Sequence, residues 1–265
     1  MSALRLGLGL GTGGRPPPAW APTDLAGLTL WLPPDPSVAT LAQTSGGSGA
    51  VADGDPIGRI EERSPLAAVY LQATAGRRPT YDEDALGTGK RGAIFDRVDD
   101  SWTDVVDPLD PIRTLGLSYR LDSTSASGEY QCLCHLVQSD GAVLIAYVCN
   151  AGGYTTLSIS NNGASAAGVG VAGVCNDTSS HTLVITYNGG TRTSPASYGV
   201  RIDGVARTVA SSGTHAPTAG TSSIGRYPAG VFPASMRLGA AVATTDVLAG
   251  ADLTNLETYL NGLRS

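Results

Sequence analysis

The chain has 265 residues, and its 35 glycines and 16 prolines require frequent turns. Hydrophobic residues make up 42% of the sequence, which supplies a core and excludes a disordered chain. With 17 basic and 23 acidic residues the net charge is −6, and no Lys/Arg cluster is present, so nucleic acid is excluded as a partner. No stretch reaches the roughly 18 consecutive apolar residues of a membrane span, so no membrane partner is expected.

The pattern divides the chain into an extended arm, residues 1–22, and one body, residues 23–265. Leucine alternates with glycine at positions 6–11, which favours an extended backbone over the apolar helix of a cleaved leader, so we expect the segment to be retained. The prolines at 16–18 form a stiff spacer before the body. We expect the arm to lie along another chain or add a strand to it, and the alternative is an arm folded back on its own body.

From Leu28 onward, short apolar runs are separated by Gly, Asn, Asp and Pro, which predicts an all-β antiparallel sandwich. Residues 33–63 carry few apolar side chains and are expected to form a long surface excursion that contains no second core. Strands are predicted at residues 28–32, 67–72, 92–95, 101–105, 115–121, 130–138, 142–148, 154–160, 168–174, 181–188, 198–202, 205–210, 222–225 and 236–244.

A hairpin and a short C-terminal helix complete the predicted elements. Asp203-Gly204 stands between two apolar runs and accepts the positive φ angles of a two-residue turn. Apolar residues then recur at three- and four-residue spacing from 253 to 263, which predicts a helix whose leucine face packs on the sandwich. Its start is expected either at Asp252 or at a capping box of Thr254 and Glu257.

The four cysteines, Cys132, Cys134, Cys149 and Cys175, permit three pairings. Cys132 and Cys134 are two residues apart in a predicted strand, so both are expected on one face, with His135 on the other. A metal site would need more ligands nearby. We therefore expect buried, reduced thiols that pack as small hydrophobes.

Four motifs follow one another between residues 25 and 102. They are Leu28-Thr29-Leu30-Trp31-Leu32 before Asp35, Val51-Ala52-Asp53-Gly54-Asp55-Pro56-Ile57-Gly58, Arg77-Arg78-Pro79-Thr80-Tyr81, and Phe95-Asp96-Arg97-Val98-Asp99-Asp100. In this order they resemble the laminin-G-like, concanavalin A-like jelly rolls of bacteriophage and gene-transfer-agent virion proteins. Residues 181–187, the hairpin at 198–205 and the closing helix are similar to the second half of such domains, so the resemblance covers most of the chain. It implies a concanavalin A-like jelly-roll sandwich.

Six aspartates lie between residues 96 and 110, and two roles are open to them. Some laminin-G-like domains bind Ca²⁺ on a rim through such oxygens. The spacing here is not that of an EF-hand loop, and aspartates commonly accept hydrogen bonds from turn N–H groups. We therefore expect Asp96, Asp99 and Asp100 to cap turns without a metal, and Trp31 and Phe95 to be core aromatics.

Enzyme signatures are absent from the sequence. None of its five glutamates stands in the tight Glu-x-Asp-x-x-Glu pattern of related glucanases, whose paired carboxylates lie about 5–5.5 Å apart. The three histidines are far apart, no Gly-x-Ser-x-Gly elbow occurs, and no phosphate-loop fingerprint is present. We expect neither catalysis nor a cofactor.

Binding is the chemistry that remains, because sugar rings stack on aromatic side chains while polar groups hold their hydroxyls. Asp99, Asp100, Trp102 and Tyr227 are the candidate ligand-binding residues, since the two aromatics stand next to polar or Gly/Pro turn residues. Tyr154 is a further candidate platform. Ordinary packing is the alternative for each aromatic.

The resemblance implies a non-enzymatic virion component that displays a lectin-like jelly roll and adheres to host-surface glycan. The alternatives are a purely architectural decoration, spike or tail subunit without a ligand, and a polysaccharide depolymerase. Expected partners are other virion subunits through the arm, a host-surface glycan, and further copies of the chain in a homo-oligomer within the particle.

Overall fold

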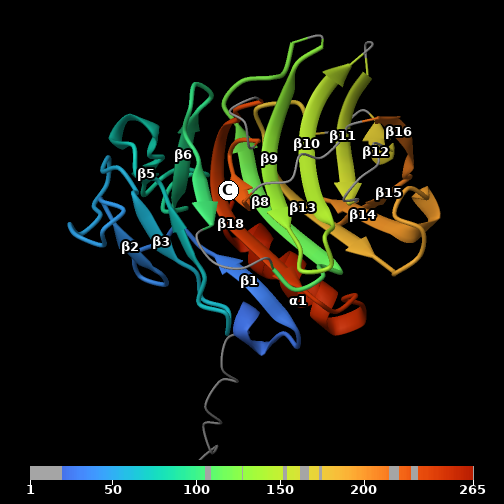
Figure 1. Cartoon of the computed structure of the whole chain (residues 1–265), viewed down its shortest axis with the longest axis horizontal. Coiled ribbons are helices and arrows are strands. Elements are labelled where there is room, and N and C mark those ends of the chain that lie inside the picture. The colour runs from blue at the N-terminus through green and yellow to red at the C-terminus, as the bar shows by residue number, and fades with distance from the viewer. Residues whose placement is uncertain are drawn as a thin grey trace, which may run out of the picture.

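The computed structural model of the protein describes residues 20–104, 109–126, 128–151, 154–161, 167–172, 175–214, 221–227 and 232–264. Within them the chain forms two antiparallel sheets of eight and ten strands and one C-terminal α-helix. Figure 1 shows the strands and, in red, the C-terminal helix. The predicted all-β antiparallel sandwich is therefore confirmed. Residues 1–19 of the predicted arm lie outside the described residues. No helix of the described chain is long and apolar enough to cross a membrane.

The eight-stranded sheet has the order β15-β14-β13-β8-β18-β6-β5, and β1 pairs with β18 beside this path. Its strands are β1 (Leu28–Leu32), β5 (Thr80–Asp82), β6 (Gly92–Asp96), β8 (Thr114–Leu121), β13 (Ser180–Tyr187), β14 (Tyr198–Ile202), β15 (Val205–Arg207) and β18 (Ser235–Thr244).

The ten-stranded sheet has the order β16-β12-β11-β10-β9-β17-β7-β4-β3-β2. Its strands are β2 (Thr40–Ala42), β3 (Arg59–Glu61), β4 (Val69–Leu71), β7 (Trp102–Asp104), β9 (Tyr130–Val137), β10 (Val143–Ala151), β11 (Tyr154–Asn161), β12 (Ala167–Ala172), β16 (Ala210–Thr214) and β17 (Ser223–Ile224). The helices are the 3₁₀ turns η1 (Pro22–Asp24), η2 (Ala75–Arg77) and η3 (Pro195–Ser197), and the α-helix α1 (Gly250–Gly262).

The main core fills the space between the two sheets, because alternate residues of each strand point inward. On β8 these are Leu115, Leu117 and Tyr119, and all three are almost fully buried. Leu144 of β10 and Phe95 of β6 join the same cluster, the latter as predicted. Each fully buried leucine contributes about 2 kcal/mol relative to an exposed one.

Residues 33–63 do not form the long surface excursion that the sequence predicts. They contain β2 and β3, and Ile57 and Ile60 are fully buried in the main core. A strand of three residues is too short to show a recognisable alternation of apolar and polar side chains. These strands form because β2 pairs with β3, and β3 is joined through β4 to β7 in the ten-stranded sheet. The strand predicted at 205–210 likewise divides, since β15 ends at Arg207 and β16 belongs to the other sheet.

Helix α1 packs its leucine face on the eight-stranded sheet, as predicted. Leu256 and Leu260 are fully buried over Gly116 of β8, where a Cβ atom would lie 2.9 Å from Leu260 Cδ1. The predicted caps are wrong, because the helix begins at Gly250, its N-cap is Ala249, and no side chain caps it.

The Asp203-Gly204 hairpin is confirmed. The two residues have φ angles of 55° and 75°, and they join the antiparallel strands β14 and β15. Both central residues therefore lie in the left-handed region that a type I′ turn requires.

A bulge in β9 overturns the predicted placement of two cysteines. The register of β9 against β10 shifts at Leu133, so Cys134 enters the main core while Cys132 faces an outer cluster with Tyr227. His135 packs its ring on Tyr227 at 5.2 Å, which places it on the Cys132 side rather than opposite. The inserted residue breaks the two-residue period on which the prediction rested.

Cys132, Cys134 and Cys175 are buried and free, whereas the side chain of Cys149 lies outside the described part of the chain. Burial raises the pKa of the Cys134 and Cys175 thiols to about 12. These thiols remain protonated at neutral pH and pack as small apolar groups.

Candidate functional site

A pocket of about 490 Å³ lies between α1, β1 and the loop that joins β5 to β6. Segments far apart in the sequence line it. Its three aromatic and five charged side chains are those of Trp20, Trp31, Tyr259, Asp35, Glu83, Asp84, Lys90 and Arg91. We refer to it as the helix pocket.

Trp31 faces the helix pocket because it alternates with Leu30 and Leu32, and a bulge in β1 turns Leu28 to the same side. In a regular strand Leu28 and Leu30 would share a face, but the pairing of β1 with β18 shifts between these two residues. Leu28 and Trp31 consequently both join the cluster under α1, while Leu30 and Leu32 point into the main core. Trp31 is a buried aromatic, as predicted, although it packs in this second cluster rather than between the sheets.

Tyr259 of α1 connects the aromatic wall of the pocket. Its ring centroid lies 6.1 Å from that of Trp20 and 6.2 Å from that of Trp31. The Trp31 indole N–H donates a 2.9 Å hydrogen bond to the Tyr259 hydroxyl, which leaves the proton of that hydroxyl for an acceptor in the pocket. Burial raises the Tyr259 pKa to about 12, so the group is a neutral phenol at physiological pH.

The turn η1, directly after Trp20, fixes the position at which the chain joins the body. The Ala21 N–H donates to the Asp24 carboxylate at 2.9 Å, and the Asp24 N–H donates back to the Ala21 carbonyl. Pro22 begins the turn with a fixed φ angle. Trp20 and Ala21 pack against the cluster under α1, so these last residues of the predicted arm belong structurally to the body.

Asp35 and Arg91 form the polar side of the pocket. Asp35 Oδ1 accepts bonds from the Ser37 N–H at 2.9 Å and the Ser37 hydroxyl at 2.7 Å, which shapes the loop after β1. Arg91 Nη1 donates to Asp35 Oδ1 at 3.0 Å and to Ser37 Oγ at 3.1 Å. The hydrogen bond that Arg91 donates to Asp35 raises the pKa of the exposed Arg91 above its ordinary value.

The loop between β5 and β6 brings Lys90 to the end of α1. Asp84 Oδ1 accepts the Gly89 N–H at 2.5 Å, and the Lys90 N–H donates to the Gly87 carbonyl at 2.8 Å. The folded loop allows Lys90 Nζ to donate a 2.8 Å bond to the Gly262 carbonyl. This contact joins the loop to the helix that supplies Tyr259.

The helix pocket therefore combines apolar rings with fixed donors and acceptors. Trp20 and Tyr259 are half-buried, so their rings remain accessible, while Asp35, Arg91 and Lys90 present polar atoms. Pockets of about 300–1,000 Å³ with this combination suit small organic ligands. A sugar ring, with one apolar face and several hydroxyl groups, matches both parts of the lining.

The predicted residues Asp99 and Asp100 lie at the opposite end of β6 from Arg91. Five residues of extended strand separate Arg91 from Asp96, which corresponds to roughly 16 Å. The predicted aspartate group is thus not part of the helix pocket.

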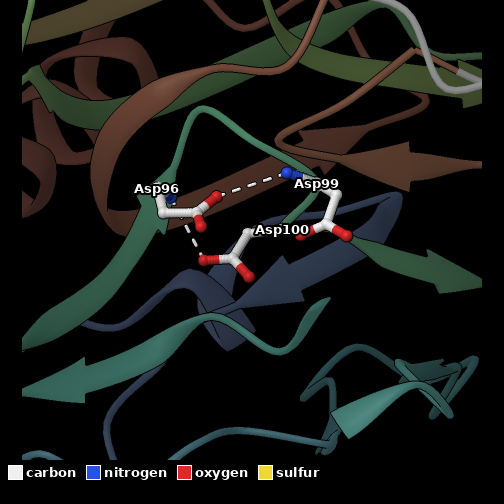
Figure 2. A group of neighbouring side chains, drawn as sticks. All are labelled: Asp96, Asp99 and Asp100. Atoms are coloured by element: carbon white, nitrogen blue, oxygen red, sulfur yellow. Dashed lines mark hydrogen bonds between the residues drawn. The ribbon is translucent and has the colours of Figure 1, made fainter. Parts of the chain in front are cut away.

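Asp96 and Asp100 accept turn N–H groups, as the sequence predicts, whereas the Asp99 carboxylate pairs with Arg77 instead. Asp96 Oδ1 accepts the Val98 N–H at 2.8 Å and the Asp99 N–H at 3.3 Å, while Asp100 Oδ2 accepts the Asp96 N–H at 3.1 Å, as drawn in part in Figure 2. Oxygen atoms of the three carboxylates lie within 4.8 Å of one another. Asp99 is also paired with Arg77 at 3.0 Å. Each of the three carboxylates therefore has a hydrogen-bond or ion-pair partner within the chain.

Burial perturbs one member of this cluster. Asp100 is 6% exposed, and the loss of solvation, together with the neighbouring Asp96, raises its pKa to about 6. The hydrogen bond from the Asp96 N–H opposes the rise only in part. Asp100 is therefore a structural carboxyl group with a reduced tendency to ionise.

Trp102 and Tyr227 are buried, which corrects their assignment as ligand platforms. Trp102 is fully buried, packs edge-on against Phe95 at 5.2 Å and donates its indole N–H to the Ile57 carbonyl at 3.0 Å. Tyr227 is 6% exposed and packs against His135. The side chain of Tyr154 lies outside the described residues.

Sequence patterns missed the helix pocket because each of its residues has an ordinary local explanation. Tyr259 fits the apolar face of a helix, and Trp31 fits a buried strand. Trp20 was the one residue that could have indicated the pocket. A large aromatic side chain beside a proline-rich spacer has no apolar neighbours in the sequence to pack against, so it must contact a distant segment.

No family model and no curated protein matches this chain. Among solved structures, the botulinum neurotoxin type G receptor binding domain aligns with a TM-score of 0.51 and 7% identity, over 89% of this chain and 51% of its own. The CBM40 of a Ruminococcus gnavus IT-sialidase bound to α2,6-sialyllactose aligns with a TM-score of 0.37 and 13% identity, over 56% of this chain and 83% of that one. Trypanosoma rangeli sialidase aligns with a TM-score of 0.43 and 13% identity, over 92% of this chain and 34% of the sialidase.

The likeness to the toxin domain shows the fold alone at this level of identity. The chain spans about half the length of that protein and about a third of the sialidase. The matched proteins include both binding domains and sugar-cleaving enzymes.

Proposed function

We propose that this protein is a non-enzymatic glycan-binding β-sandwich and that the helix pocket holds one sugar residue. The observation that carries the proposal is the wall of Trp20, Tyr259 and Trp31 facing the Asp35–Arg91 pair inside one pocket. The apolar face of a sugar stacks on the two half-buried rings, and its hydroxyls exchange hydrogen bonds with the ion pair.

We further propose that the protein is a component of a phage-like virion and binds glycan there. The motifs that resemble virion jelly rolls support it, and residues 1–22 then attach the body to other virion subunits. In this setting copies of the chain form a homo-oligomer within the particle, and the pockets adhere to host-surface glycan. Several identical pockets on one particle strengthen weak single-site binding through avidity.

The pocket is tested with an array of bacterial surface glycans, followed by calorimetric titration of the sugars that bind. Trp20→Ala removes a ring from the pocket wall and is expected to weaken binding about tenfold or more. The matched control is Tyr130→Ala, which truncates a half-buried aromatic on the ten-stranded sheet and leaves binding unchanged. Equal affinity of the wild type and Trp20→Ala would contradict binding in this pocket.

The reaction class is tested in the same samples by measuring released reducing ends. Binding without released ends supports adhesion. Absence of both signals supports the architectural alternative and contradicts glycan binding. Released ends contradict a non-enzymatic role and support a depolymerase.

The attachment role is tested by deleting residues 1–18, which leaves Trp20 and η1 in place. The thermal unfolding midpoint of the body is expected to stay unchanged, while incorporation into particles fails. Full incorporation of the shortened chain would contradict attachment through the arm.

A further inference from the structure

The helix pocket contains more acidic than basic side chains. Arg91 already pairs with Asp35 at 3.0 Å, and Lys90 Nζ already donates to the Gly262 carbonyl at 2.8 Å. That carbonyl lies in the last turn of α1, where unpaired carbonyls carry partial negative charge. Each basic group of the lining therefore has a negative partner before any ligand enters.

Glu83 and Asp84 add two exposed carboxylates to the lining. Their backbone N–H groups are bound to Asp53 Oδ1 at 2.9 Å and Asp82 Oδ1 at 2.7 Å, which holds both residues on the loop after β5. Together with Asp35 they give three carboxylates against two cations, so the lining has a net charge of −1. The pocket surface is acidic.

An acidic sugar would meet this surface at a disadvantage. Its carboxylate would have to compete with Asp35 for Arg91 and with the Gly262 carbonyl for Lys90, and it would lie near the charges of Glu83 and Asp84. Sugar hydroxyls face no such penalty, because they donate hydrogen bonds to carboxylate oxygens and accept hydrogen bonds from the Arg91 guanidinium. The charge pattern thus discriminates between two classes of sugar that have the same ring.

Building on the proposed glycan binding, we infer that the helix pocket selects an uncharged sugar residue and rejects uronic and sialic acids. Trp20 and Tyr259 supply the stacking surface for either class. Glu83 and Asp84 supply the repulsion that excludes the acidic class.

The test compares methyl glucoside with methyl glucuronoside, and N-acetylglucosamine with N-acetylneuraminic acid, by saturation-transfer NMR and titration on the full chain. The first pair differs at one carbon, where a hydroxymethyl group replaces a carboxylate. The neutral sugars are expected to bind at least about tenfold more tightly. Equal or tighter binding of the acidic sugars would overturn the selectivity while leaving glycan binding intact. Failure of every sugar would overturn the proposed function itself.

A double variant tests the cause of the selectivity. Glu83→Gln with Asp84→Asn removes two negative charges and keeps an acceptor oxygen for the Gly89 N–H. The preference for methyl glucoside over methyl glucuronoside is expected to fall about tenfold. Asp110→Asn removes an exposed charge outside the pocket and is the matched control. An undiminished preference in the double variant would overturn the charge mechanism, as would an equal fall in the control.

Discussion

The backbone N–H of Trp31 donates a 3.0 Å hydrogen bond to the carboxylate of Glu62, which is 3% exposed. The same carboxylate accepts bonds from the Ser64 N–H and hydroxyl, both at 2.6 Å, and from the Ala68 N–H at 2.9 Å. One buried side chain therefore ties β1, which carries the pocket tryptophan, to the turn between β3 and β4. Four donors stabilise its charge in place of water.

Glu62→Gln is expected to lower the free energy of unfolding by about 3 kcal/mol. The amide offers one acceptor oxygen, and its NH₂ group would face N–H donors. Glu61→Gln is the matched control, because Glu61 is half-exposed and pairs with Arg59 at the surface, a contact worth about 1 kcal/mol or less. Urea unfolding of both variants measures the difference. Equal losses would contradict the role assigned to Glu62.

Tyr259→Phe removes the hydroxyl that accepts the Trp31 indole N–H. The indole donor then lacks its partner in a largely buried position, so we expect a loss of about 1–2 kcal/mol in unfolding free energy. Thr258→Ala removes an exposed hydroxyl from the same helix and is expected to change stability by less than about 0.5 kcal/mol. Urea titration followed by tryptophan fluorescence measures both, and an unaltered Tyr259→Phe midpoint would count against this bond.

Gly225→Ala is expected to destabilise the protein by about 3 kcal/mol or more. Gly225 has a φ of +84°, and an added Cβ would lie 2.3 Å from Phe95 Cδ1 in the main core. Gly76→Ala is the control, because a Cβ added there would have no atom within 4 Å apart from its chain neighbours. Thermal unfolding should separate the two variants, and similar midpoints would refute the tight packing of Gly225 on Phe95.

Asp100 makes stability depend on pH. Its folded-state pKa of about 6 lies above the ordinary value of 3.8, so the native protein holds the proton more tightly than the unfolded chain. This group therefore lowers the free energy of unfolding as pH rises from about 4 to about 6. Asp100→Asn keeps an acceptor for the Asp96 N–H and removes the charge.

The Asp100→Asn variant is expected to be more stable than the wild type at pH 7.5, by roughly 1–2 kcal/mol, and equally stable near pH 3.5. Denaturant unfolding at both pH values measures the difference. Asp99→Asn is the control, since Asp99 is paired with Arg77 and half-buried. A stability difference that does not vary with pH would show that Asp100 ionises normally.

The aspartate cluster is expected to need no metal, because its carboxylates accept turn N–H groups and pair with Arg77. Addition of EDTA should leave the thermal unfolding midpoint unchanged. A fall of several degrees, restored by Ca²⁺, would establish a metal site there.

Local sequence patterns were enough to predict the sandwich, the terminal helix and the Asp203-Gly204 hairpin. Each depends on short-range physics: alternation of apolar side chains in strands, three- and four-residue spacing in a helix, and positive φ angles in a turn. The strands at Leu28–Leu32 and Tyr198–Ile202 match the prediction at both ends for this reason.

The helix pocket could not be predicted from local sequence patterns, because its residues come from segments that meet only after the sheets have paired. Trp31 meets Tyr259 because α1 packs on that face of β1, and pairing of β7 inside the ten-stranded sheet buries Trp102 in the core. Neither effect has a local signal, because the groups that cover these tryptophans, Tyr259 and Ile57, lie in segments distant in the sequence.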